Sequence, residues 1–252
     1  MFRRIALKSA TALCFGMAVL AGSVQAQQPL GYVVTQVEVE PGAAGQFETF
    51  VRNYKAAAEA IDWPTAWTAS QIAVGNTNSY TFVSAFTSHS QLSVPSAALL
   101  SQAHSADEVV EIVQDLRESV KSLVTGTYYL REDLSNPFPQ AMSNPEVFVT
   151  IGVNIEPGTN LDFEYWIQRV ADASDSNFWN GLVKGYGEGF NYVFRTPTSW
   201  AALDQAPTSP QQRVLDQYGP IAGTAITDLA AGSAVEAVYN LVVNRPELSY
   251  TP

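Results

Sequence analysis

The chain has 252 residues, with 24 acidic side chains against 13 lysines and arginines and a formal net charge of −11. This length is enough for one large domain or two small ones. Because an acidic protein lacks the basic surface that attracts phosphate groups, we expect no nucleic-acid partner and no binding to anionic lipid.

The first 26 residues have the pattern of a secretory signal peptide. Basic residues at Arg3, Arg4 and Lys8 precede an apolar run over 11–22, and small residues lead up to Ala26. The apolar run is shorter than the roughly 20 residues that a membrane-spanning helix needs. The sequence therefore predicts cleavage after Ala26, a periplasmic or secreted protein, and no membrane association after cleavage.

The single cysteine, Cys14, lies inside this segment. The exported chain would therefore contain no disulfide, no catalytic thiolate and no thiolate metal ligand.

The next elements along the chain alternate between strand and helix patterns. Residues 31–40 alternate with β-branched side chains and predict a strand, and apolar residues at helical spacing from Ala44 predict a helix that ends near Pro64. Strands are predicted over 67–74 and 79–86. Ser105 and Glu108 have capping-box spacing, and the helix that they begin is expected to bury Val120, Leu123 and Val124 before a last strand over 127–132.

The second half of the chain repeats the first. The turn Glu-Pro-Gly at 40–42 recurs at 156–158, and the predicted elements recur as strand 147–155, helix 160–172, strands 178–186 and 189–196, helix 209–231 and strand 234–243. Matching residues follow in order: Phe47 with Phe163, Trp67 with Trp179, Tyr80 with Tyr192, Phe82 with Phe194, and Arg131 with Arg245. This is an internal duplication.

The predicted order in each half is β-α-β-β-α-β, which is that of a ferredoxin-like unit. We expect an α+β protein in which two such halves, 27–135 and 147–252, cover each other's sheets and form an intramolecular barrel. A connector with three prolines, 136–146, joins them.

This arrangement resembles the dimeric α+β barrel superfamily, which includes antibiotic-monooxygenase-like, EthD-like and NIPSNAP-like proteins. The resemblance rests on the element order, the duplication and the aromatic residues of the hairpins. It implies a ligand space inside the barrel or between sheet and helices, and functions that range from cofactor-free oxygenation to haem chemistry to no known activity.

The two histidines, His89 and His104, are the candidates for a haem ligand that the resemblance implies. Neither has a partner at metal-ligand spacing, so we expect surface or capping roles, no metal site and no cofactor, with haem as the alternative. No nucleophile motif is present, and the glycines over 181–189 fit a strand-turn-strand better than a phosphate loop.

The candidate ligand-binding residues are those expected on the strand face opposite the helices. In the first strand of each half, one alternating set is apolar and should pack under the helices. The other set is mixed and includes Gln36 and Asn154. With residues from the neighbouring elements, the candidates are Gln36, Asn154, Tyr192, Arg195, Trp67, Trp179 and His104. The aromatic members could instead be ordinary core.

Two functions remain open from the sequence. The first is an exported protein, monomeric or homo-oligomeric, that binds a small hydrophobic or aromatic molecule or a partner protein without catalysis. The alternative is a cofactor-independent monooxygenase or isomerase that acts on such a molecule. The absence of a clear acid/base pair favours the first.

Overall fold

The computed structural model describes residues 29–93, 97–136, 145–174, 178–205 and 208–252. The predicted signal peptide (1–26) and most of the predicted connector (136–146) lie outside the described residues.

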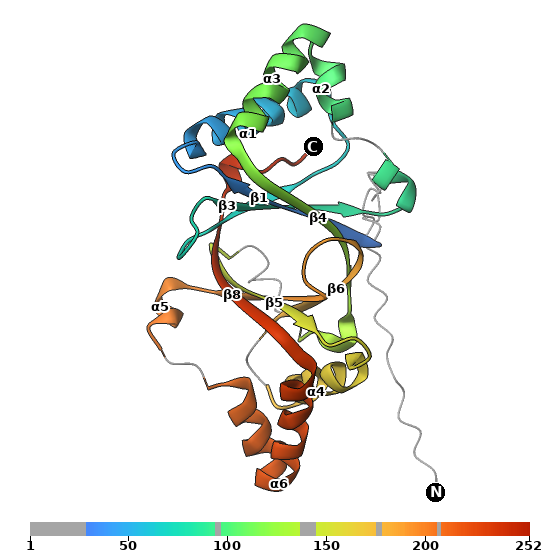
Figure 1. Cartoon of the computed structure of the whole chain (residues 1–252), viewed down its shortest axis with the longest axis vertical. Coiled ribbons are helices and arrows are strands. Elements are labelled where there is room, and N and C mark those ends of the chain that lie inside the picture. The colour runs from blue at the N-terminus through green and yellow to red at the C-terminus, as the bar shows by residue number, and fades with distance from the viewer. Residues whose placement is uncertain (1–28, 94–96, 137–144, 175–177, 206–207) are drawn as a thin grey trace, which may run out of the picture.

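The two halves of the chain contain the same succession of elements (Figure 1). The first half comprises β1 (Gly31–Val39), α1 (Ala44–Ala60), β2 (Thr68–Ile72), β3 (Ser79–Phe86), α2 (Ala97–Ala103), α3 (Ala106–Ser119) and β4 (Val120–Leu130). The second comprises β5 (Val147–Ile155), α4 (Asn160–Asp172), β6 (Asn180–Gly187), β7 (Tyr192–Thr198), α5 (Trp200–Leu203), α6 (Pro210–Ser233) and β8 (Ala234–Asn244). Short 3-10 turns follow β3, β4 and β8 at η1 (His89–Ser93), η2 (Glu132–Leu134) and η4 (Pro246–Leu248).

The strands form one closed antiparallel barrel in the order β1-β3-β2-β8-β5-β7-β6-β4. Each half contributes a four-stranded sheet, β4-β1-β3-β2 or β6-β7-β5-β8, which is the ferredoxin-like order and confirms the predicted fold class. The outer strands of the two sheets pair with each other, β2 with β8 and β4 with β6. Closure therefore leaves neither sheet with a free edge.

The helices pack on the outside of the barrel, with α1, α2 and α3 at one end of the molecule and α4 and α6 at the other (Figure 1). In the first half, Val37 and Val39 of β1 are buried in a cluster with Phe47 of α1. In the second, Val153 of β5 is buried in a cluster with Phe163 of α4. The predicted apolar strand face thus lies under the helices, which leaves the mixed face to line the barrel interior. No helix of the described segments is long and apolar enough to cross a membrane.

The start of β4 differs from the prediction. The capping box of Ser105 and Glu108 is present, but α3 ends at Ser119, and Val120 already pairs with Val39 of β1. The prediction that Val120, Leu123 and Val124 belong to the helix was wrong. The apolar spacing of this segment fits a helix as well as a strand, and pairing with β1 decides in favour of the strand.

Each half is held by the tail of the other. The tail after β8 returns to the first half, where the Trp67 indole Nε1 donates a hydrogen bond to the Leu248 carbonyl at 2.9 Å. The tail after β4 reaches the second half, where the Trp179 Nε1 donates to the Leu134 carbonyl, also at 2.9 Å. The internal duplication therefore folds like a dimer whose subunits have exchanged their ends.

Candidate functional site

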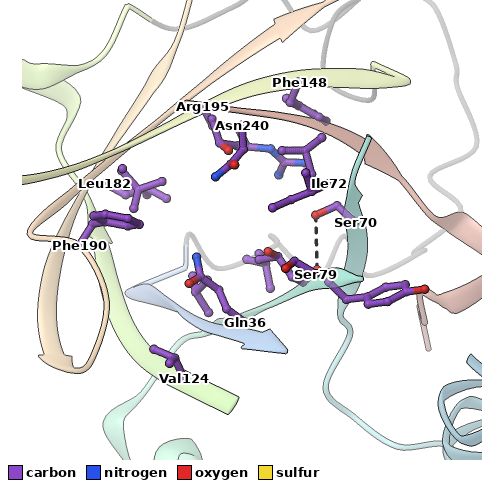
Figure 2. A pocket seen from close by; sticks show the side chains of 18 of the residues that line it. Gln36, Ser70, Ile72, Ser79, Val124, Phe148, Leu182, Phe190, Arg195 and Asn240 are labelled. Atoms are coloured by element: carbon purple, nitrogen blue, oxygen red, sulfur yellow. Dashed lines mark hydrogen bonds between the residues drawn. The ribbon is translucent and has the colours of Figure 1, made fainter. Parts of the chain in front are cut away.

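A cavity of about 430 Å³ lies inside the barrel and is lined by residues from all eight strands (Figure 2). From β1, it receives Tyr32, Val34 and Gln36, the alternating set that points away from the helices. Most of the remaining wall is apolar, with Ile72, Leu182, Phe190 and Val242 among its members. Pockets of this size and character are typical of small-molecule sites.

One row of polar side chains crosses the second-half sheet on the cavity side. Thr150 of β5 pairs with Asn240 of β8 on one side and with Arg195 of β7 on the other, and Arg195 in turn pairs with Asn180 of β6. All four residues line the cavity. Because directly paired residues on one face of a sheet have neighbouring side chains, these groups form one continuous polar strip.

Arg195 is the one cation of the described cavity lining. Its guanidinium carbon lies 3.5 Å from the ring centroid of Phe148, and its Nη2 donates a hydrogen bond to Asn244 Oδ1 at 3.2 Å. No ion pair with Arg195 occurs within the described ranges. Burial inside the barrel lowers the pKa of Arg195 to about 10, so the side chain is still charged at neutral pH.

Arg195 and Phe148 also line a second cavity, of about 470 Å³. This cavity extends to Lys55 and Glu59 of α1 and to Thr251 near the end of the chain. The stacked pair therefore lies between the barrel interior and the space next to the exchanged tail.

Glu38 is the only carboxylate among the described residues that line the first cavity. It accepts hydrogen bonds from Lys121 at 2.8 Å and from Asn76 at 3.0 Å. The Lys121 hydrogen bond is the main reason that the pKa of Glu38 is lowered, followed by that of Asn76. A carboxylate held in its charged form by a lysine is a weak general base.

Of the residues predicted from the sequence, the structure places Gln36 and Arg195 on the cavity. Asn154 instead accepts a hydrogen bond from the Asn191 amide and donates to Glu236. Tyr192 points toward α4 and donates to Glu164, whereas Trp67 and Trp179 bind the exchanged tails. His104 lies just before α3, and its Nδ1 is 4.0 Å from Glu108.

Asn240 and Asn180 are site residues that the sequence reasoning missed. Each lies in a segment whose sequence predicts a strand but gives no sign of a binding role. Only the pairing of Asn240 with Thr150 and of Asn180 with Arg195 places them in one row. Within the described part of the chain, no group of three or more histidine, cysteine, aspartate or glutamate residues is placed to hold a metal ion.

Several solved structures have a similar fold, whereas no family model and no curated protein matches the chain. An anthrone oxidase-like protein is 11% identical, with a TM-score of 0.55 over 87% of this chain and 93% of that one. A protein assigned as a monooxygenase from Lactobacillus acidophilus NCFM is 7% identical, with a TM-score of 0.48 over 88% and 95%. Chlorite dismutase from Candidatus Nitrospira defluvii is 9% identical, with a TM-score of 0.47 over 87% and 93%.

The chain has the dimeric α+β barrel fold. Both the barrel closure and the similarity to the anthrone oxidase-like structure bear out the resemblance found in the sequence. At 11% identity this similarity concerns the fold alone.

The comparison corrects the expectation that the protein has no cofactor. Chlorite dismutase-like proteins, which bind haem, are among the structures with a similar fold, so the expectation was wrong as an inference from this architecture.

The described residues of the cavity do not fit haem. The iron needs an axial ligand such as histidine, cysteine, methionine or tyrosinate. His89, which lies 3.1 Å from the Tyr129 hydroxyl, and His104 are both absent from the cavity lining. Tyr32 and Tyr80 also line the cavity, but burial raises the pKa of both and disfavours the tyrosinate. We therefore derive no chemical step through haem.

Proposed function

We propose that the protein is an enzyme of the monooxygenase or isomerase type that acts on a small aromatic or hydrophobic molecule inside the barrel. The observation that carries this proposal is a mostly apolar cavity with one cation among its described residues, Arg195, which lies between Asn180 and Thr150 in a polar row ending at Asn240. The anthrone oxidase-like protein of similar fold gives the reaction type its support.

The polar strip suits reactions that pass through a substrate oxyanion. Oxygenation and isomerisation next to a carbonyl or phenol both place negative charge on the substrate oxygen once the substrate has given its proton to water. A fixed guanidinium and side-chain amides in a site shielded from water stabilise such charge strongly. The apolar wall would hold the ring system and exclude water.

The proposal is tested by turnover in the presence of dioxygen. Anthrone and 1-naphthol serve as probes, with oxygen uptake and product absorbance as readouts. Val34→Trp, which fills the cavity, should reduce the rate to the protein-free background. Leu123→Trp, on an exposed position of β4, is the matched control and should keep the wild-type rate. Equal rates in the wild type and Val34→Trp would contradict the proposal.

A second candidate is a binding protein without catalysis. The observation in its favour is that Glu38, the single carboxylate of the described cavity lining, is paired with Lys121 and is a poor base. Binding of the aromatic probes without turnover of either would support this candidate over the enzyme.

A further inference from the structure

We propose that the barrel selects a hydrophobic aromatic molecule that carries one carboxylate, and that Arg195 holds this carboxylate. The inference rests on the proposed function, because it names the substrate class of the same cavity. Two observations support it: Arg195 has no ion-pair partner among the described residues, and the equivalent position in the first half is a valine.

The first argument is that Arg195 forms no ion pair with the described residues. Its recorded contacts within the described residues are the Asn244 side-chain oxygen and the face of the Phe148 ring. A guanidinium has several N–H donors in a planar fork, so most of them are left for another acceptor. A buried charge without a partner is costly, and a bound carboxylate would supply both the opposite charge and the acceptor oxygens.

The second argument is that the fold does not require an arginine at this position. The internal duplicate of the strand pair β5–β7 is the pair β1–β3, in which Val34 pairs with Val83 where Thr150 pairs with Arg195. Both valines line the same cavity. Since the first half closes its sheet with valine there, packing alone does not explain Arg195.

The same asymmetry extends along the whole row. Where the second half has Asn240, Thr150, Arg195 and Asn180 in register, the first half has Gly126, Val34, Val83 and Thr68. A polar row with a central cation therefore occurs in the second half only, although Gln36, Glu38, Ser70, Ser79, Thr81 and Ser122 of the first half also line the cavity. A ligand whose polar head meets this row at Arg195, and whose apolar body lies against the valine, leucine, isoleucine and phenylalanine side chains of the lining, matches the cavity.

Phe148 and Glu38 narrow the ligand class further. The ring of Phe148, stacked on the guanidinium, fixes the plane of the fork and favours a planar, two-oxygen acceptor such as a carboxylate. Glu38 is already paired with Lys121, so Arg195 is the one charged group of the described lining that is left to pair with a ligand carboxylate. A single available cation fits a monocarboxylate better than a dicarboxylate.

The test compares anthracene-9-carboxylate with its neutral isostere anthracene-9-carboxamide, by fluorescence titration at neutral pH. The wild type should bind the carboxylate about 10- to 100-fold more tightly than the amide, the range for a hydrogen bond to a charged group. Arg195→Val, which copies the duplicate's Val83, should lose this preference and keep its affinity for the amide. Arg195→Lys should keep part of the preference, because it keeps the charge without the fork.

The matched control is Arg117→Gln, which removes an exposed arginine of α3 and should leave both affinities unchanged. Equal binding of carboxylate and amide by the wild type would overturn the inference, whatever the variants do. An equal loss of both ligands in a folded Arg195→Val would also overturn it, since the arginine would then act on the cavity as a whole.

The outcomes separate this inference from the proposed function. A carboxylate preference that depends on Arg195, without turnover of any probe, supports the inference and contradicts the enzyme. Turnover of the neutral probes together with equal binding of acid and amide contradicts the inference alone. Failure of the wild type to bind either anthracene contradicts the inference, and failure to turn over anthrone or 1-naphthol as well contradicts both.

Discussion

Arg245 and Glu48 lie 197 residues apart in sequence, and the Arg245 Nη2 donates to the Glu48 Oε1 at 2.7 Å. The Tyr80 hydroxyl donates to the same carboxylate oxygen at 3.0 Å. Arg245 belongs to the tail that follows β8, whereas Glu48 lies in α1 of the first half. One ion pair thus fastens the end of the chain to the first helix.

The second half contains the same network. Arg131, from the tail after β4, pairs with Glu164 of α4 at 2.9 Å, and the Tyr192 hydroxyl donates to Glu164 at 2.8 Å. Each first helix is therefore tied through a buried tyrosine and an arginine to the tail of the other half. Because these networks join the two halves, we expect the halves to unfold as one cooperative unit.

The first prediction concerns the coupling between Glu48 and Arg245. We expect Glu48→Gln and Arg245→Gln each to lower the free energy of unfolding by about 1–3 kcal/mol, since each leaves a largely buried partner without its counter-charge. Urea unfolding of both single variants and the double variant gives a thermodynamic cycle, and the double variant should lose less than the sum of the two.

Arg52→Gln is the control for this cycle. Arg52 also pairs with Glu48, at 2.8 Å, but half of its side chain is exposed, so its loss should cost about 0–1 kcal/mol. Additive effects of Glu48→Gln and Arg245→Gln would show that the pair does not hold the tail in place.

The element order, the duplication and the fold class could be predicted from the sequence because each rests on local patterns. The apolar spacing of α1 and the alternation of β1 follow from short segments of chain. The end of α3 was harder to predict, because the spacing of the apolar residues from Val120 to Val124 fits both a helix and a strand. Only the pairing with β1 shows that this segment is a strand. Pairing between distant strands decides such segments.

The candidate site was harder to predict than the fold. Gln36 and Arg195 could be named because a polar residue in an apolar strand is visible in the sequence. Trp67 and Tyr192 also have matching residues in the other half, but their polar groups do not bond within the cavity. The Trp67 indole donates to the tail after β8, and the Tyr192 hydroxyl donates to Glu164 of α4. A sequence pattern gives the face of a strand but not the register between strands, and register assembles the polar row around Arg195.

A second prediction concerns acid stability. Burial tends to raise the pKa of Glu48, but hydrogen bonds from Arg245 and Tyr80 outweigh it, and the net pKa is lowered from the ordinary value of 4.5. A carboxyl group whose folded pKa is depressed stabilises the protein above its unfolded pKa, and this stabilisation is lost as the pH falls through the folded value. We therefore expect the free energy of unfolding to fall with pH below about 4.5, the ordinary value of the group.

Glu48→Gln should make the free energy of unfolding less dependent on pH below about 4.5, in equilibrium unfolding measured from pH 7 to pH 3. Glu40→Gln, at an exposed position in the turn after β1, is the comparison and should leave the slope as in the wild type. If the free energy of unfolding falls with pH as steeply in Glu48→Gln as in the wild type, other carboxylates determine the acid sensitivity.

A third prediction concerns the exchanged tail. Trp67→Phe removes the buried N–H that donates to the Leu248 carbonyl, so this acceptor is left unsatisfied in the core. The expected loss is about 1–3 kcal/mol in the free energy of unfolding. Trp200→Phe, which changes an exposed tryptophan of α5, should cost much less and is the matched control. Similar losses in the two variants would argue against a structural role for the indole hydrogen bond.

The fourth prediction concerns Gly152, which lies on the cavity side of β5 beside the Phe190 ring. A Cβ at this position would overlap Phe190, whereas the equivalent position in β1 holds Gln36. Gly152→Ala should therefore displace the ring and cost about 1–3 kcal/mol in stability, measured by urea unfolding. Gly45→Ala, at an open position early in α1, should instead raise stability by about 0.5–1 kcal/mol. Phe190→Leu in the Gly152→Ala background should recover part of the loss, because the smaller side chain leaves room for the methyl group. If Phe190→Leu recovers nothing, the cost of the alanine arises from the β5 backbone rather than from the ring at the cavity wall.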